Sequence, residues 1–478
     1  MTASDRRGFL RDVGVAGAAL ALPARAAETK PQTRPNILFI ITDQQHAGMM
    51  SCTGNPHLKT PALDRLAASG IRFERAYTSN PVCLPARFAF VTGRMPSAVG
   101  VGLNADGGRA AITPAIQRQA MGNLFRNAGY ETVYGGKVHL PRRMGLDAIG
   151  FRRLTGNTRG PLADACVQFL KQPHGKPFLL VASFINPHDI CYMGINAYRH
   201  SKGQPPIGNV DSKTCEGLLE EPRKSLEEFV EKHCPPLPAN HGVPALEPEC
   251  ITRNYVDRRQ FRAYIRKSWP PAMWRLHRWA YCRLTERVDV HIGRVLDAVR
   301  DAGLEGSTLI VFTSDHGDHD SAHRLEHKST LYEEAARIPL ILSRKGIIPA
   351  GVVDTTHLVS NGLDLLPTLC DAAGIEPPGG LFGRSLRPLA EGRKIASWRD
   401  HLVVESQNGR MVRTARFKYC LYDSGARREQ LTDLEADPGE MTNLASAPRH
   451  AATLAHHRAL LKKWVEQTGD PIAGKYLQ

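Results

Sequence analysis

Residues 35–44 read PNILFIITDQ. The run from Asn36 to Thr42 is almost wholly apolar and does not alternate with polar residues, which is typical of a strand buried on both faces of a parallel sheet. Further apolar runs occur at Phe178–Ile185, Thr308–Thr313 and Pro339–Ser343. Helical patterns separate these runs, so the sequence predicts an α/β domain with a large, mainly parallel sheet flanked by helices.

The helical patterns cover Pro61–Ala68, Gln117–Ala128 and Ala272–Ala302. In the first of them, Thr60 fits the N-cap and Pro61 the first helical position, where a missing backbone N–H has no cost.

A different pattern begins after Trp398. Short strand-like runs occupy His401–Ser406, Arg410–Thr414, Phe417–Leu421 and Gln430–Leu434, and an amphipathic helix covers Ala452–Thr468. These runs predict a small C-terminal antiparallel sheet with a helix. We therefore expect a main domain over residues 27–394 and a C-terminal subdomain over residues 395–478.

Residues 190–270 contain several prolines, many charges and four of the chain's ten cysteines. This stretch reads as a long, irregular insertion, which either shapes a substrate pocket or decorates the surface. In an exported protein, its cysteines could form disulfides that staple it, although no spacing resembles a zinc motif and the pairing cannot be deduced. The four are Cys191, Cys215, Cys234 and Cys250.

The formal charge of the 478-residue chain is +15. A basic protein favours anionic partners, such as sulfated or phosphorylated substrates, anionic polysaccharide, nucleic acid or a membrane surface. The sequence contains no nucleic-acid-binding motif, so we expect no nucleic-acid partner. A protein that is basic without a specific anionic partner is the alternative.

The N-terminus resembles an export signal. Arg6-Arg7 is followed by the apolar stretch Val13–Leu22 and by Ala24-Arg25-Ala26, which fits a cleavage site. Residues 1–26 are therefore expected to be a twin-arginine signal peptide, and the protein to be periplasmic or secreted. The apolar stretch is too short to span a bilayer, and we expect no transmembrane anchor.

Polar residues follow two of the predicted strands. Asp43-Gln44 ends the first strand, and Asp315-His316 ends the run at Thr308–Thr313. Ligands collect at the carboxyl ends of parallel strands, so these residues could together hold a divalent cation. The oxygen-rich set suits Ca²⁺ or Mg²⁺, and the histidine also allows Mn²⁺. A helix cap is the plainer interpretation of Asp43-Gln44 taken alone.

Other strand ends carry basic residues. His188 follows the run at Phe178–Ile185, and Lys137 and His139 are spaced so that both could face one anion on an extended chain. Lys328 lies a short distance after Asp315 and could supply a second cation to the same site. A structural histidine at 188 and a solvated lysine at 137 are the alternatives.

Three more histidines, His319, His323 and His327, lie between Asp315 and Lys328. A zinc cluster of these residues is conceivable, but we expect most of them to lie around the site or on the surface.

Residues 83–87 read CLPAR. Pro85 suits the first turn of a helix running to about Thr92, which places Cys83 at the helix N-terminus, where an anion is favoured. Arg87 follows one turn later. A buried, inert cysteine is the alternative.

With CLPAR and Thr92-Gly93-Arg94 in view, the chain resembles the formylglycine-dependent sulfatases of the alkaline-phosphatase-like superfamily, over nearly its full length. The resemblance implies a sulfuric ester hydrolase whose catalytic domain covers residues 27–394 and whose Cys83 is oxidised to formylglycine by a maturation enzyme. It also implies that Asp43, Gln44, Asp315, His316 and the modified Cys83 bind the metal.

The family mechanism begins with hydration of formylglycine to a geminal diol, one hydroxyl of which attacks sulfur while Arg87 orients it. Lys137 and Lys328 neutralise sulfate oxygens, and His188 protonates the leaving alcohol. His139 then deprotonates the second hydroxyl, which expels sulfate. The expected substrate is a sulfated saccharide or another sulfate ester.

The chain departs from common family residues at Ala86, Gln44, His316 and Val138, where Ser, Asp, Asn and Trp are frequent. Two alternatives are a phosphonate or phosphate ester hydrolase of the same superfamily and an inactive glycan-binding relative with an unconverted Cys83. A zinc phosphodiesterase is disfavoured, because that branch has Thr or Ser in place of the cysteine.

Overall fold

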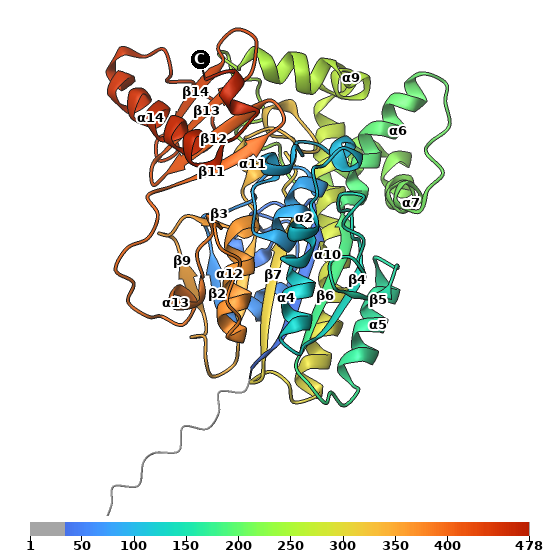
Figure 1. Cartoon of the computed structure of the whole chain (residues 1–478). Coiled ribbons are helices and arrows are strands. Elements are labelled where there is room, and N and C mark those ends of the chain that lie inside the picture. The colour runs from blue at the N-terminus through green and yellow to red at the C-terminus, as the bar shows by residue number, and fades with distance from the viewer. Residues whose placement is uncertain (1–33, 478) are drawn as a thin grey trace, which may run out of the picture. The chain divides into compact units, whose positions relative to one another are not determined.

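The computed structural model describes residues 34–477 of the chain. Its β1 (Asn36–Asp43) lies inside an eight-stranded sheet of order β5-β4-β6-β1-β7-β8-β2-β9 (Figure 1). The other strands are β2 (Ile71–Phe73), β4 (Glu131–Gly136), β5 (Arg152–Thr155), β6 (Phe178–Pro187), β7 (Thr308–Ser314), β8 (Leu340–Ser343) and β9 (Val352–Asp354). Neighbouring strands from β5 to β7 are parallel, whereas β8 is antiparallel to β7 and β2. The predicted large, mainly parallel sheet is confirmed.

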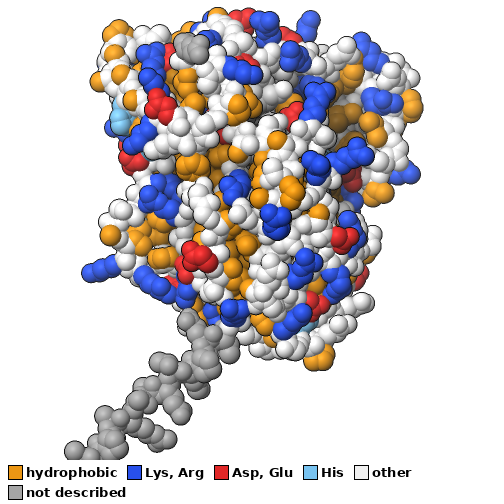
Figure 2. Space-filling model, in the orientation of Figure 1, with side chains coloured by type: hydrophobic (Ala, Val, Ile, Leu, Met, Phe, Trp, Pro, Cys, Tyr) orange, Lys and Arg blue, Asp and Glu red, His pale blue; other side chains and the backbone are white. Residues whose placement is uncertain are grey.

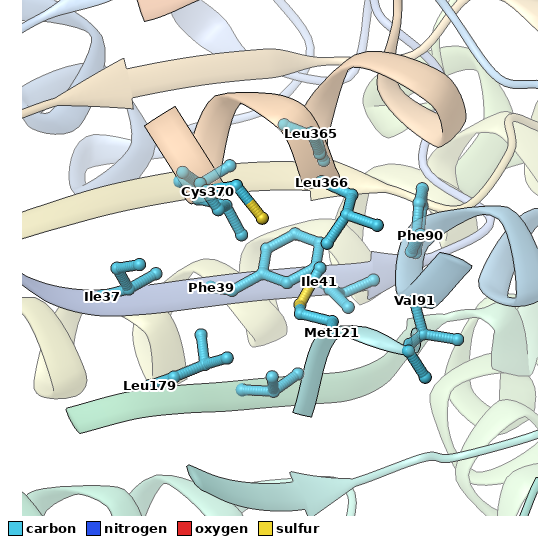
Figure 3. Close-up of a cluster of buried hydrophobic side chains, with 14 of the residues drawn as sticks. Ile37, Phe39, Ile41, Phe90, Val91, Met121, Leu179, Leu365, Leu366 and Cys370 are labelled. Atoms are coloured by element: carbon cyan, nitrogen blue, oxygen red, sulfur yellow. The ribbon is translucent and has the colours of Figure 1, made fainter. Parts of the chain in front are cut away.

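Helices cover both faces of this sheet (Figure 1). They are α1 (Pro61–Ala68), α2 (Cys83–Thr92), α4 (Met121–Asn127), α5 (Gly160–Leu170), α10 (Pro271–Asp301) and α12 (Asn361–Ala373). Ile37, Phe39 and Ile41 of β1 pack with α2, α4 and α12 (Figure 3). Leu38 and Ile40 point to the opposite face and pack with α1, α5 and α10. Because both faces are covered, β1 needs no polar positions.

The predicted helix at Gln117–Ala128 is wrong as a single element. The chain forms α3 (Pro114–Arg118), breaks, and resumes as α4. Ala120 is extended at the break, and the Asn123 side-chain amide donates to the Gln117 carbonyl oxygen at 2.8 Å, which takes the place of a continuing helical bond.

The stretch at 190–270 is mostly helical, so the prediction of an irregular insertion is wrong. It contains α6 (Cys191–Ser201), α7 (Val210–Lys224), α8 (Leu226–His233), a π-helical segment (Ile251–Asp257) and α9 (Gln260–Ser268). The apolar sides of α6, α7, α8 and α9 pack against the first half of α10, whereas those of the π-helical segment pack with the C-terminal sheet. Most of the prolines lie in the connections between the helices, as at Pro205-Pro206. All ten cysteines of the chain are free thiols, so the expected staple does not form.

The C-terminal sheet is antiparallel and confirms the prediction. It consists of β11 (His401–Ser406), β12 (Gly409–Thr414), β13 (Phe417–Tyr422) and β14 (Glu429–Asp433). Val403 and Val412 face α14 (Ala451–Thr468), while Leu402 and Met411 face Tyr332 and other residues of the main body. The chain from Arg34 onward forms one compact unit. The domain boundary at residue 394 stays a prediction.

Two short strands, β3 (Ala76–Tyr77) and β10 (Val359–Ser360), pair with each other. The chain also forms two short helices, α11 (Glu333–Ala336) and α13 (Arg387–Ala390).

The predicted signal peptide, residues 1–26, lies outside the described residues. Within residues 34–477, no helix combines the length and the apolar character that crossing a membrane would require. Lys and Arg are spread widely over the face in Figure 2, as the charge of +15 leads one to expect.

Candidate active site

The central strands bring predicted site residues to one edge of the large sheet. β1 pairs with β6 on one side and β7 on the other, and β4 pairs with β6. Asp43 ends β1, while Lys137, His188 and Asp315 follow directly after β4, β6 and β7. Parallel pairing therefore places four residues from distant parts of the sequence at the same carboxyl edge.

Four of the predicted metal-binding residues converge. Ligand atoms of Asp43, Cys83, Asp315 and His316 lie within 4.8 Å of one another, and all four residues are buried. The Cys83 Sγ lies 3.1 Å from His316 Nε2 and 3.7 Å from Asp43 Oδ1. His316 Nδ1 lies 2.9 Å from the Gly317 carbonyl oxygen, which can only accept, so Nδ1 carries a proton and Nε2 is the ring nitrogen directed at the group. This donor set fits a divalent cation.

Arg87 joins the two carboxylates of this group. Its Nη2 lies 2.9 Å from Asp43 Oδ2 and its Nε lies 2.9 Å from Asp315 Oδ2. Its Nη1 donates to Ser183 Oγ at 2.8 Å and to the Lys137 carbonyl oxygen at 2.9 Å. A guanidinium that is 1% exposed thus has an acceptor for each nitrogen. Such pairing is what makes a buried charge tolerable.

The two carboxylates differ in acidity. Burial alone would raise the pKa of Asp43, but the charges of Lys137 and Arg87, among others, hold that pKa well below its ordinary value. Burial and the neighbouring Asp43 raise the pKa of Asp315 to about 6. The first carboxylate is therefore the more firmly ionised of the two.

Lys137 reaches Asp43 because the end of β4 is tightly packed. Gly136 has a φ of +91°, and a Cβ on it would lie 2.0 Å from the Ser183 carbonyl oxygen. Only glycine suits this position. The next residue donates its backbone N–H to that same oxygen at 2.9 Å, and the Lys137 Nζ lies 2.6 Å from Asp43 Oδ2. We call Asp43, Cys83, Arg87, Lys137, Asp315 and His316 the site floor.

Gln44 connects the floor to Lys328. Its Oε1 accepts from Lys328 Nζ at 2.6 Å and from the Cys191 thiol at 3.1 Å, and its Nε2 donates to Asp318 Oδ2 at 2.7 Å. The side chain that we expected to bind a metal is thus directed at the second lysine. Its metal role stays a prediction.

The two predicted proton-transfer histidines lie nearby and are half-buried. Burial and the charges of Lys328 and Lys137 hold the pKa of His188 well below its ordinary value, so this histidine is neutral in the free protein. His139 has a φ of 45° and a buried Nδ1 without a hydrogen-bond partner. Among the described residues, no hydrogen bond connects its ring to the floor.

The floor adjoins a cavity of about 560 Å³. Its walls include His188 and Lys328 beside the floor, the insertion helices, and the β11–β12 turn at residues 406–408. The insertion therefore lines a cavity next to the site, and its role in shaping a substrate pocket stays a prediction.

The conceivable zinc cluster does not form, because His319, His323 and His327 do not converge. His319 Nε2 lies 3.1 Å from Thr330 Oγ1, the His327 ring contacts Glu326, and the His323 ring stacks on another side chain, Tyr332.

His323 does lie near two carboxylates, Glu334 and Glu440. However, the Lys418 Nζ is 2.6 Å from Glu440 Oε1, so a side-chain cation already balances this group.

Sequence reasoning missed three residues that support the site: Ser183, Cys191 and Asp318. Ser183 is a polar residue inside a buried apolar run, which is a signal that could have identified it. The pairing of Cys191 and Asp318 with Gln44 depends on tertiary contacts that no spacing predicts.

Residues 35–375 match the family model "Sulfatase". The chain belongs to the sulfatase family. Residues 321–467 also match the model "N-sulphoglucosamine sulphohydrolase, C-terminal". The predicted family and fold class are confirmed, and the enzyme is a sulfuric ester hydrolase. The family implies a metal ion and a formylglycine formed from the cysteine.

Three relatives illustrate the similarity of this sulfatase to known proteins. A Delta 4,5-hexuronate-2-O-sulfatase of Bacteroides thetaiotaomicron is 30% identical, over 94% of this chain and 92% of the relative. A solved structure of a 2-O GAG sulfatase is 29% identical with a TM-score of 0.75, covering 91% of this chain and 93% of the other. The phosphonate monoester hydrolase of Agrobacterium radiobacter shares the fold at 21% identity, with a TM-score of 0.70 and coverage of 91% and 96%.

Proposed function

We propose that this sulfatase hydrolyses a sulfate ester of an anionic saccharide, using an oxygen nucleophile formed from Cys83 at a divalent cation. The observation that carries the proposal is the convergence of Cys83 with Asp43, Asp315 and His316 within 4.8 Å. A cysteine at a helix N-terminus, among metal-ligand side chains and two lysines, has the surroundings that such a nucleophile needs.

The cation would be held by Asp43, Asp315, His316, the modified Cys83 and Gln44. Ca²⁺ is our first choice because the set is rich in oxygen, with Mg²⁺ and Mn²⁺ as alternatives. When bound, the cation would supply positive charge to the sulfate and lower the pKa of a hydroxyl on residue 83. To bind it, Gln44 must share an oxygen that Lys328 now uses.

The hydrated aldehyde formed from Cys83 would supply one hydroxyl to attack sulfur and a second whose deprotonation releases sulfate by C–O cleavage. The encoded thiol already reports the electrostatics at this point. Burial alone would raise the pKa of Cys83, but Lys137, Lys328 and His316 hold it well below its ordinary value. The site therefore favours an anion where the nucleophile would form.

Conversion of Cys83 must precede the completed fold. The side chain, at the N-terminal end of α2, is 1% exposed and therefore out of reach of another protein. We propose that a formylglycine-generating enzyme acts on the chain before this region folds, and that the Arg6-Arg7 signal then exports the protein to the periplasm or beyond.

The sulfate would lie between Lys137 and Lys328, which neutralise its oxygens. Both lysines depress the pKa of His188 in the free protein, and an anion bound between them opposes that effect. Substrate binding would thus raise the pKa of His188 toward the range in which it can protonate the leaving alcohol. His139 would act as the base that removes the second hydroxyl's proton.

A saccharide is the proposed substrate because the relative at 30% identity is a Delta 4,5-hexuronate-2-O-sulfatase and the alignment covers nearly the whole chain. The cavity of 560 Å³ beside the floor has the size of a small-ligand site.

Two measurements test the proposal. Mass spectrometry of the peptide containing Cys83, from the native host, should show the mass of an aldehyde; an intact thiol would favour an inactive glycan-binding relative. Turnover of an aryl sulfate and of a phosphonate monoester should be compared with the same preparation. A strong preference for the phosphonate would reassign the reaction to phosphonate ester hydrolysis.

A further inference from the structure

The cavity next to the floor has an unusual distribution of charge. Arg258, Arg259 and Arg262 line it, together with Lys328, whereas no aspartate or glutamate does. Arg258 follows the π-helical segment, Arg259 is the N-cap of α9, and Arg262 lies in the first turn of α9. We call them the arginine wall.

None of the three forms an ion pair with a carboxylate of residues 34–477 in the structure. Arg262 is held by other means. Its guanidinium lies 3.9 Å from the centre of the Tyr255 ring, and its Nη1 donates to the Tyr255 carbonyl oxygen at 3.3 Å. Its Nε is buried without a hydrogen-bond partner. The side chain is therefore fixed in place with donors to spare.

One turn further along α9, Arg266 provides a contrast. It makes a two-pronged pair with Glu247, at 3.0 Å and 2.8 Å. Arg266, away from the cavity, thus has a carboxylate partner, whereas the arginines that line the cavity have none. The charge of Arg262 acts on one buried carboxyl group, that of Glu326. Glu326 is 2% exposed and does not line the cavity.

The site floor, which includes Lys137, and the neighbouring Lys328 are sufficient to bind a single sulfate group. Arg258 and Arg259 are exposed and Arg262 is half-buried, and an anion bound between the three would relieve the repulsion of their like charges. Arginine forks match the paired oxygens of a carboxylate or a sulfate.

We propose that the arginine wall binds a second anionic group of the substrate, a carboxylate or a second sulfate, while the floor holds the sulfate that is hydrolysed. The inference rests on the proposed function, because it extends the same substrate. It identifies the substrate class as a saccharide with at least two anionic groups, such as a sulfated uronic acid or a disulfated amino sugar.

The test compares kcat/KM on three substrates: a monosulfated neutral sugar, a monosulfated uronic acid and a disulfated amino sugar. Arg258→Gln, Arg259→Gln and Arg262→Gln are assayed singly and together, with Arg253→Gln as control. Arg253 is exposed in the same π-helical segment but does not line the cavity. Normal melting temperatures would show that the variants fold.

We expect wild type to prefer one or both dianionic substrates by at least about tenfold, and the triple variant to lose that preference. The neutral sulfated sugar and the control variant should show little change. The substrate whose kcat/KM falls most in the triple variant shows whether the second anion is a carboxylate or a sulfate. An equal loss on all three substrates, or no loss on any, would overturn the proposal.

A separate measurement covers the case in which no substrate is turned over. Calorimetric binding of each dianionic sugar to the Cys83→Ala protein, with and without the three arginine substitutions, does not require the reaction. Binding that weakens about tenfold or more in the triple variant supports the arginine wall even if the sulfatase chemistry fails. Unchanged binding rejects the wall even if the chemistry holds.

Discussion

The site floor and the arginine wall both contain several positively charged side chains, but these charges are balanced in opposite ways. In the floor, Arg87 has two carboxylate partners and Lys137 has one, all inside the protein. On the wall, the arginines have none. The charges of the floor are therefore balanced by the protein itself, whereas in our proposal a ligand balances those of the wall. Changes to the floor should affect every sulfate ester, and changes to the wall should affect only substrates with a second anion.

The largest expected effect is that of Cys83→Ala. Turnover of any sulfate ester should fall by at least about 10⁴-fold, because the nucleophile is lost while the rest of the floor remains. Stability should change by only about 1 kcal/mol, since the side chain is small. Steady-state assays and urea unfolding measure the two quantities.

Cys166→Ala is a suitable control for that variant, because Cys166 is equally buried but lies in the core between α5 and the sheet. Near-normal activity of Cys83→Ala would remove the nucleophile assignment and, with it, the reason for treating the floor as catalytic.

Arg87→Met should have the next largest effect. It leaves Asp43 and Asp315 buried without their shared partner, which should lower the free energy of unfolding by about 3–5 kcal/mol. Activity should fall by about 10³-fold on all substrates, because electrostatic positioning of the nucleophile is lost. Urea unfolding and an aryl sulfate assay measure these changes. A stable, active variant would show that the carboxylates of the floor do not depend on Arg87 for charge balance.

His188→Asn should have an effect that depends on the leaving group. A sugar alcohol needs a proton as it departs, so kcat for a saccharide sulfate should fall by about 10² to 10⁴-fold. An activated aryl sulfate, whose leaving group departs unprotonated, should be affected far less. Parallel assays of the two esters give the ratio, and an equal loss on both would argue for a positioning role instead.

The smallest effect concerns Glu326, the acid near the arginine wall. Burial raises its pKa from 4.5 to about 7, so the folded protein holds a proton that the unfolded chain releases. The free energy of unfolding should therefore decrease as the pH rises from about 4.5 to about 7, by about 3 kcal/mol from this group. Glu326→Gln should remove that part of the pH dependence.

Urea unfolding at pH 5 and pH 8 provides the measurement for this last variant. Glu227→Gln, at an exposed position on α8, is the control. If Glu326→Gln leaves the pH dependence unchanged, the carboxylate is ionised in the folded protein and balances Arg262, and the contrast between floor and wall becomes weaker.

Much of the floor could be predicted from the sequence, because its geometry follows from strand order. Asp43 and Asp315 end two apolar runs, and parallel pairing brings such ends together whatever lies between them. Cys83 and Arg87 were identifiable because a short helix fixes their spacing. The family resemblance was needed to assign catalytic roles to these residues, but not to predict that they lie close together.

The rest depends on contacts between distant segments. The prolines in residues 190–270 suggested irregular structure, but they separate helices whose stability comes from packing on α10. Likewise, the sequence shows that Arg258 and Arg266 are basic, yet only the fold shows which of them has a carboxylate partner. The position of Gln44 after a strand suggests a metal ligand. Its contact with Lys328 could not be predicted, because the two residues are 284 positions apart in the sequence.

The β11–β12 turn, which forms one side of the cavity, has a consequence for synthesis. Ribosomes make chains from the N-terminus, so the floor residues through His316 emerge well before residues 406–408. A nascent chain therefore carries Cys83 for some time before this side of the cavity exists. If a modifying enzyme acts on the unfolded chain, as we propose, that interval is open to it, while the half-made protein cannot enclose a substrate. The order of the elements along the chain would then separate the period of maturation from the period of activity.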